Sequence, residues 1–204
     1  MVTVAVVYHS GYGHTGKQAK AVVEGVEGAE GARGLLIPVD KIGNHWSDLE
    51  RADAIIFGTP TYMGSASAQF KEFMDASSKV WSTQAWKDKI AAGFTSSASQ
   101  SGDKLNTLIQ LAVFAAQHSM IWVSTGLMPG NNSSKGSVED LNRLGSYLGA
   151  MAQSNMDEPA ETAPPATDLR TAANLGRRIA EVAKRWKNGA KGLKSDSHAV
   201  SAAA

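Results

Sequence analysis

The chain has 204 residues, 43% of them hydrophobic, which suits one compact domain with a buried core and excludes a wholly disordered or fibrous protein. It contains no cysteine, so disulfides and thiolate chemistry are excluded and any redox function requires a bound cofactor. The first residues have no basic segment or cleavage site typical of a signal peptide, and no apolar run reaches the roughly 20 residues that span a bilayer. We therefore expect a cytoplasmic protein without membrane insertion.

The net charge of +1 is unevenly distributed. Residues 177–194 hold seven Lys and Arg residues against one Glu, whereas residues 1–176 hold 13 basic and 17 acidic residues, a net charge of −4. A basic segment of this kind can attract nucleic acid or anionic lipid. No groove-reading motif accompanies it, so we interpret it as the solvated face and end of a last helix, and nucleic acid is not an expected partner.

Apolar, β-branched segments alternate along the chain with segments whose apolar residues recur at helical spacing. The predicted strands are residues 2–8, 34–39, 51–58, 89–94 and 120–124. The predicted helices are residues 17–27, 65–80, 105–118 and 168–187. The alternation predicts an α/β protein with a doubly wound, five-stranded parallel sheet and helices on both faces, and we expect the strand order 2-1-3-4-5. Loops after strands 1, 3 and 4 would then lie at the edge where such sheets bind ligands.

One domain is predicted over residues 1–187, and it contains a long irregular segment at residues 125–167. That insertion is rich in Gly, Asn, Ser and Pro, and a connection of such length inside a compact domain is usually functional or disordered. It could cap a ligand or form a subunit contact. Residues 188–204 are predicted to be a flexible tail.

Residues 10–17 read Ser-Gly-Tyr-Gly-His-Thr-Gly-Lys, between a predicted strand and a predicted helix. The first amides of a helix have no helical partner and the helix dipole is positive there, so this loop suits an anion. The alternative is a tight turn capped by Thr15, but three glycines and two hydroxyls exceed what a cap requires. The residues predicted to bind a phosphate are Ser10, Gly11, Tyr12, Gly13, His14 and Thr15.

Two nucleotide interpretations of this loop compete. Gly11 and Gly16-Lys17 match the glycine and lysine spacing of a P-loop. Gln18 follows, however, where a Ser or Thr hydroxyl should bind Mg²⁺, and phosphoryl transfer without it loses its main means of charge neutralisation. A P-loop NTPase is therefore the weaker alternative, and a metal-free loop for the phosphate of FMN is favoured.

Two further loops support a flavin. Residues 58–64 read Gly-Thr-Pro-Thr-Tyr-Met-Gly, in which an aromatic ring and a methionine can line a flat ring and a rigid Pro turn can bond its polar edge. Residues 95–102 read Thr-Ser-Ser-Ala-Ser-Gln-Ser-Gly and offer hydroxyl donors at a helix start. Ordinary connections are the alternative for both. The predicted cofactor contacts are Pro60, Thr61, Tyr62, Met63, Gly64, Thr95, Ser96, Ser97, Ala98, Ser99, Gln100 and Ser101.

The three loops, in this order, resemble the flavodoxin-like NAD(P)H:quinone oxidoreductases of the WrbA type. A Gln-His pair at residues 117–118 and Gly-Ser-Tyr-Leu-Gly-Ala at residues 145–150 add to the resemblance, which covers about residues 1–186. It implies a flavodoxin-like fold, FMN as cofactor, NAD(P)H as electron donor and a quinone as acceptor. It also implies a homotetramer in which neighbouring subunits complete each site.

The resemblance further implies residue roles. His118, which alone is more often a structural histidine, would lie near the flavin as the catalytic residue and give a proton to the reduced quinone. Tyr12, Trp81 and Tyr147 would contact the substrate, although Trp81 also suits simple packing at a helix end. No metal site is implied.

Three departures from the family pattern stand out. Tyr62 replaces a common arginine, the third loop is not glycine-rich, and residues 153–158 replace a glycine-rich part of the insertion. The sequence thus predicts an FMN-dependent two-electron oxidoreductase, with hydride passing from NAD(P)H to a quinone. The alternative is a flavin-binding electron carrier or regulatory module, although one-electron carriers of this fold tend to be strongly acidic.

Overall fold

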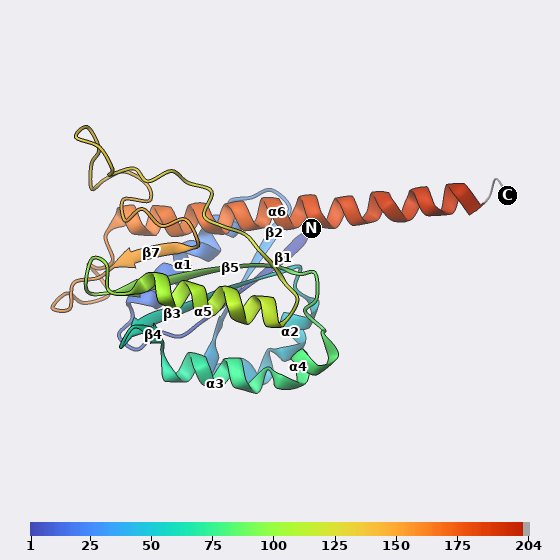
Figure 1. Cartoon of the computed structure of the whole chain (residues 1–204), viewed down its shortest axis with the longest axis horizontal. Helices are drawn as coiled ribbons and strands as arrows, with labels where there is room; N and C mark the ends of the chain where they lie inside the picture. The colour runs from blue at the N-terminus through green and yellow to red at the C-terminus, as the bar shows by residue number, and fades with distance from the viewer. Residues whose placement is uncertain (202–204) are drawn as a thin grey trace.

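The computed structural model describes the backbone of residues 1–201 and the side chains of residues 1–189, and it is an α/β sandwich (Figure 1). The strands are β1 (Val2–Tyr8), β2 (Ala32–Pro38), β3 (Ala54–Tyr62), β4 (Ser65–Ala66), β5 (Ile90–Ser97), β6 (Ile121–Trp122) and β7 (Ala150–Gln153). The helices are α1 (His14–Glu27), the 3₁₀ helix η1 (Val39–Asn44), α2 (Trp46–Arg51), α3 (Ala68–Ala76), α4 (Ser78–Thr83), α5 (Lys104–Gln117) and α6 (Ala166–Ser201).

The sheet follows the path β2-β1-β3-β5-β6, which confirms the predicted doubly wound order. All pairs along this path are parallel, and β4 adds a short antiparallel pair to the end of β3. β1 is apolar on both sides because Val4 and Val6 pack against the α1 and α6 face, whereas Ala5 and Val7 pack against the α3 and α5 face. Each face of the sheet thus has its own apolar core.

The predicted fifth strand is divided between two segments. β6 is only two residues long and pairs with Ile90 and Ala91, at the amino end of β5. The chain then leaves the sheet and returns as β7, which pairs in parallel with residues 94–97 at the carboxyl end of β5. The described sheet therefore has seven strands instead of the predicted five, and the insertion supplies one of them.

Other differences from the predicted elements are local. The single helix predicted over residues 65–80 is β4, α3 and α4, because Ser67 caps α3 and Ser77 breaks the helix by donating its hydroxyl to the Met74 carbonyl oxygen at 2.6 Å. α6 includes residues 188–201 of the predicted tail, and residues 202–204 lie outside the described residues. The flexibility of that tail stays a prediction. None of the described helices is long and apolar enough to cross a membrane.

The insertion is held to the domain by a buried ion pair. Asp168, at the start of α6 and 2% exposed, accepts from Arg143 Nε at 2.7 Å and from a second guanidinium nitrogen at 2.8 Å. The same carboxylate accepts from the backbone N–H of Gln153 at 2.9 Å. One side chain thus fixes both the middle of the insertion and the end of β7.

α1 and α6 cross at glycines, which allows their backbones to touch. A Cβ atom at Gly176 would overlap the carbonyl oxygen of Val22, and one at Gly25 would overlap that of Ala173. Figure 1 shows α6 lying along this face of the sheet beside α1. Both positions therefore need a residue without a side chain.

We expect Gly176→Ala to destabilise the protein by about 1 to 3 kcal/mol, because overpacking outweighs the gain in helix propensity. The matched control is Gly189→Ala in the same helix, where a Cβ atom meets nothing within 4 Å. That control should leave stability unchanged or raise it slightly. Urea unfolding of both variants measures the difference, and equal stabilities would contradict the close crossing.

Candidate functional site

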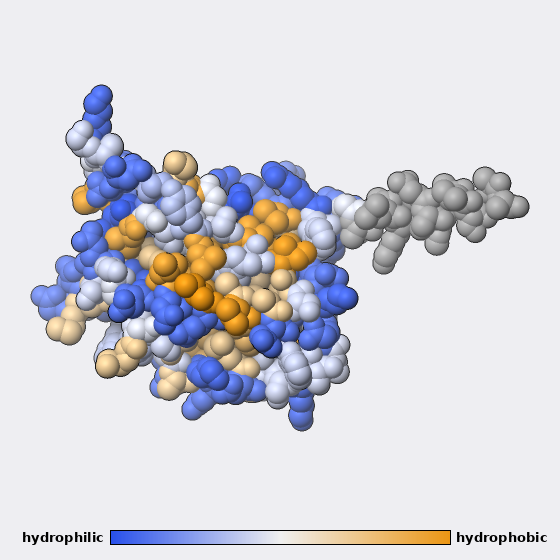
Figure 2. Space-filling model, viewed as in Figure 1, coloured by the Kyte–Doolittle hydropathy of each residue, from blue (hydrophilic) through white to orange (hydrophobic). Residues whose placement is uncertain are grey.

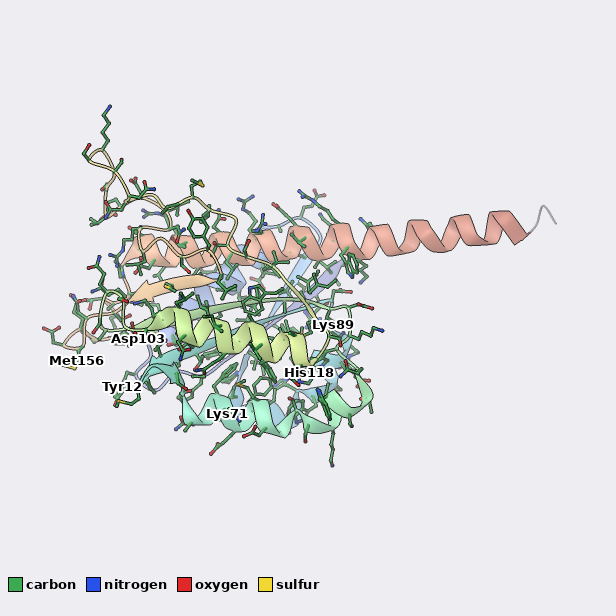
Figure 3. All side chains as sticks on the ribbon, in the orientation of Figure 1. Tyr12, Lys71, Lys89, Asp103, His118 and Met156 are labelled. Carbon is green, nitrogen blue, oxygen red and sulfur yellow. The ribbon has the colours of Figure 1, made fainter. Side chains whose placement is uncertain are left out.

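The three predicted loops and the end of the insertion line one cavity of about 560 Å³ at the carboxyl edge of the sheet. We call it the cleft. The first loop supplies Tyr12, His14 and Thr15. Residues 60–62 and 96–98 supply its floor and far wall, and Ser154, Met156, Glu158 and Pro159 close it. Figure 3 shows Tyr12 and Met156 at this end of the molecule.

The first loop leaves the backbone amides of His14 and Thr15, at the start of α1, without a capping side chain. Gly13 precedes α1 with a left-handed φ of 91° and has no side chain to cap the helix. A Cβ atom there would lie 2.7 Å from that of Ala160, so glycine is needed for the insertion to approach. Ser10 Oγ accepts from the Gly16 N–H at 2.9 Å and holds the turn. An uncapped helix start of this kind attracts an anion such as phosphate.

The insertion closes over the first loop through two contacts to backbone oxygens. The His14 ring nitrogen Nε2 is 2.8 Å from the Glu158 carbonyl oxygen. Lys17 Nζ donates to the Glu161 carbonyl oxygen at 2.9 Å. The insertion therefore forms a wall of the cleft, which was one of the two roles expected for it.

Hydroxyl groups join the second loop to the third. Thr61 Oγ1 is 2.8 Å from Thr95 Oγ1 and donates to Thr107 Oγ1 at 2.8 Å. Ser96 Oγ lies 3.1 Å from Ser154 Oγ, which ties the third loop to the insertion. These buried bonds fix the spacing of the cleft walls before any ligand enters.

Aromatic side chains form the outer edge of the cleft. The rings of Tyr12 and Tyr62 meet edge to face with centroids 6.2 Å apart. Burial raises the pKa of the Tyr62 hydroxyl, which lies against Gly11. Tyr12 is 80% exposed and Met63 is fully exposed at the rim, so a flat ligand would keep one edge accessible.

Other predicted residues lie near the cleft without lining it. Ser10 and Gly13 face a neighbouring cavity, and Thr95 is buried beneath the third loop. Gln100, Ser101 and Tyr147 line a separate pocket between α5 and the insertion. Tyr147 is thus not brought to the cleft within this chain.

His118 lies at the opposite end of the molecule from the cleft (Figure 3). The reason is geometric: α5 runs antiparallel to the strands, so its last turn reaches their amino ends. Ser77 donates to a backbone oxygen, so the His118 Nε2–H donates to Ser77 Oγ, at 2.9 Å. The ring packs on Trp86 and Phe114, and burial lowers the pKa of His118 to about 4. Among the described residues, Nδ1 has no hydrogen-bond partner.

His118 and Trp81 share a groove of about 510 Å³ that α3 and α4 form with α5, and we call it the distal groove. Trp81 is half-exposed, and the outer face of α5 adds the exposed side chains of Leu105, Ile109 and Val113. Figure 2 shows an apolar band across the face where α5 lies. Trp81, an expected substrate contact, and His118, the expected catalytic residue, therefore lie together but apart from the cleft of their own chain.

Several residues of the site are not predicted by the sequence. Ser154, Met156 and Pro159 line the cleft from within an irregular segment that no motif marks. Lys104 Nζ donates to Ser97 Oγ at 2.8 Å beneath the third loop. A lysine in the first turn of a helix interacts unfavourably with the helix dipole, and this unfavourable position is the one feature of the sequence that marks Lys104.

Comparison with known proteins identifies a matching family model and several relatives of this chain. A family model described as NADPH-dependent FMN reductase matches residues 37–135. The Pseudomonas aeruginosa protein named Flavodoxin FldP is 44% identical over 89% of this chain and 97% of its own. An Archaeoglobus fulgidus protein named NAD(P)H dehydrogenase (quinone) is 34% identical over 91% of this chain and 99% of its own.

A solved structure is similar as well. The flavodoxin, WrbA-like protein from Agrobacterium tumefaciens has 42% sequence identity and a TM-score of 0.70, and the match covers 91% of this chain and 99% of that one. Sequence identity and fold agree in this comparison. The chain belongs to the flavodoxin-like NAD(P)H:quinone oxidoreductase family of the WrbA type.

Proposed function

We propose that this protein binds FMN in the cleft and passes hydride from NAD(P)H to a quinone. The observation that carries the proposal is the cleft itself, where an uncapped helix start, two tyrosines and a hydroxyl-rich loop surround one cavity. Its volume of about 560 Å³ lies in the usual range for cofactor sites. The relatives named as quinone dehydrogenases support the same activity.

The residues present fit FMN. The backbone amides of His14 and Thr15 and the Thr15 hydroxyl would hold the phosphate, and Ser96 and Ser97 would donate to oxygens of the sugar alcohol or ring. Tyr12 and Tyr62 would orient the ring system and exclude water from one side. When bound, FMN supplies the two-electron redox chemistry, and the chain supplies placement and electrostatics.

A flavin-binding electron carrier is the second candidate. The relative named Flavodoxin FldP and the exposed rim of Tyr12, Met63 and Met156 favour it, because a carrier must expose its cofactor to a partner protein. The net charge of residues 1–176, only −4, favours the enzyme, since steering between an electron carrier and its partner uses a larger charge. A cytoplasmic location stays a prediction from the sequence.

Titration of the protein with FMN, followed by NADH or NADPH and then a quinone, tests the proposal. We expect bound flavin whose absorption bleaches with the reductant and returns with the quinone. Gly13→Ala should weaken FMN binding at least tenfold, about 1.4 kcal/mol, because the loop loses its left-handed turn. Gly43→Ala, where a Cβ atom meets nothing within 4 Å, is the matched control.

Each possible result of that titration has a distinct meaning. Flavin that binds but is not reduced by NADH or NADPH would leave the electron carrier as the function. Absence of flavin binding in the unmodified protein would overturn both candidates.

The distal groove indicates how an oligomer would complete the site. His118 and Trp81 lie far from the cleft of their own chain, and the apolar band on α5 suits contact with another copy (Figures 2 and 3). A homotetramer in which the distal groove of one subunit faces the cleft of its neighbour would bring the half-exposed Trp81 to the flavin and place the buried His118 near it. In that arrangement His118 is a neutral ring at physiological pH, because its pKa is about 4, so a proton given to the reduced quinone would have to come from the Nε2–H now bonded to Ser77.

Subunit mixing tests this arrangement. His118→Ala and Gly13→Ala should each give an oligomer with little quinone reductase activity, for different reasons. Mixed oligomers, made by coexpression, should regain activity at sites that combine an intact first loop with an intact distal groove. Activity no greater than the sum of the two parents would contradict sites shared between subunits.

Burial of neutral His118 makes stability depend on pH. The ring protonates at its ordinary pKa near 6.5 in the unfolded chain but only near 4 in the folded one. Its contribution is therefore fully present above about pH 6.5 and is lost as the pH falls towards 4. As the pH falls from about 6.5 to 4, we expect the free energy of unfolding, measured in urea, to decrease less in His118→Gln than in the unmodified protein. Equal decreases in the two proteins would be evidence against a buried neutral ring.

A further inference from the structure

Lys104 is a buried lysine beneath the third loop, at the first position of α5. Its side chain is 0% exposed. Nζ donates to Ser97 Oγ and the Ser99 carbonyl oxygen, each at 2.8 Å, and to the Gln100 carbonyl oxygen at 2.9 Å. All three N–H groups of the ammonium are thus used, which is the arrangement of a charged lysine.

The acceptors around this ammonium are all neutral. Among the side chains that the structure describes, no carboxylate is within ion-pair distance of Lys104, and the nearby Asp168 is already bonded to Arg143. The start of α5 adds an unfavourable dipole. Burial, partly offset by Asp168, lowers the pKa of Lys104 to about 8, so the charged form still predominates at neutral pH. A buried cation without a counter-ion costs folding free energy and marks a functional site.

Ser97 connects this cation to the cleft. Its side chain lines the cleft, and its oxygen accepts from Lys104. The Ser97 hydroxyl proton points to the Ser99 carbonyl oxygen at 3.0 Å, so donating it to an acceptor in the cleft would require exchanging that bond. The lysine also holds two backbone oxygens of the loop in place, which explains how a serine-rich loop adopts a fixed shape where the family pattern uses glycine.

We propose that Lys104 is a positioning residue whose buried positive charge makes the cleft bind reduced flavin more tightly than oxidised flavin. This inference rests on the proposed function. Two-electron reduction of a flavin at neutral pH adds two electrons and one proton, so the flavin gains one negative charge. A cation beneath the loop favours that product and raises the two-electron midpoint potential.

The midpoint potential of the FMN-loaded protein at pH 7 tests the proposal, together with the dissociation constant for oxidised FMN. We expect Lys104→Met to reduce the preference for reduced over oxidised flavin at least tenfold, which lowers the potential by about 30 mV for a two-electron couple. Lys104→Arg, which keeps the charge, should retain most of the preference. If Lys104→Met does not fold, Lys104→Gln is used for the same measurement.

Lys89→Met is the matched control. Lys89 is partly buried, whereas Lys104 is fully buried, and Lys89 likewise donates to two backbone oxygens, those of Glu50 and Ala52. It lies at the opposite end of the molecule from Tyr12 and Met156 (Figure 3). Its removal should leave the potential unchanged, so the comparison separates charge near the cleft from general loss of a buried lysine.

Other results would overturn the inference. Equal weakening of oxidised and reduced FMN binding in Lys104→Met, with an unchanged potential, would show that the lysine only shapes the loop. A potential that falls equally in Lys89→Met would remove the local explanation. If the unmodified protein binds no FMN, the proposed function fails first and this inference fails with it.

Discussion

The carboxylate of Asp168 is the contact on which the closed cleft depends. It pairs with Arg143 and accepts from the backbone of Gln153, so it holds the insertion and the end of β7 at once. β7 in turn places Ser154 against Ser96 and leads the chain to the residues that close the cleft. Removal of one partner from a buried ion pair costs about 3 to 5 kcal/mol because the other charge is left unpaired. The wall of the cleft is therefore coupled to the packing of α6.

The order of the sheet could be predicted because the central strands are short runs of apolar residues that must be buried on both faces. β1, β3 and β5 have this pattern, and the parallel crossovers between them leave few possible arrangements. The division of the fifth position into β6 and β7 could not be read from the sequence. A two-residue strand carries no periodicity, and Ala150–Gln153 forms a strand only because β5 offers it a free edge.

The residues of the site differ in the same way in how far the sequence predicts them. The three loops come together because each follows a parallel strand, and the carboxyl ends of those strands share one edge. The location of His118 does not follow from this rule, since His118 ends a helix that runs back to the amino edge of the sheet. Lys104 was missed because its role arises from burial, and the sequence indicated only a poorly placed charge.

The two ends of the described chain lie on the side away from the mouth of the cleft (Figure 1). β1 begins at the amino edge of the sheet, and α6 passes that edge where Lys187 Nζ pairs with Asp53 Oδ1 at 2.9 Å. α6 also covers the face opposite the distal groove. Attachment of the protein through either end, to an electrode or to a fusion partner, would therefore leave the cleft open to solution and the apolar band on α5 uncovered.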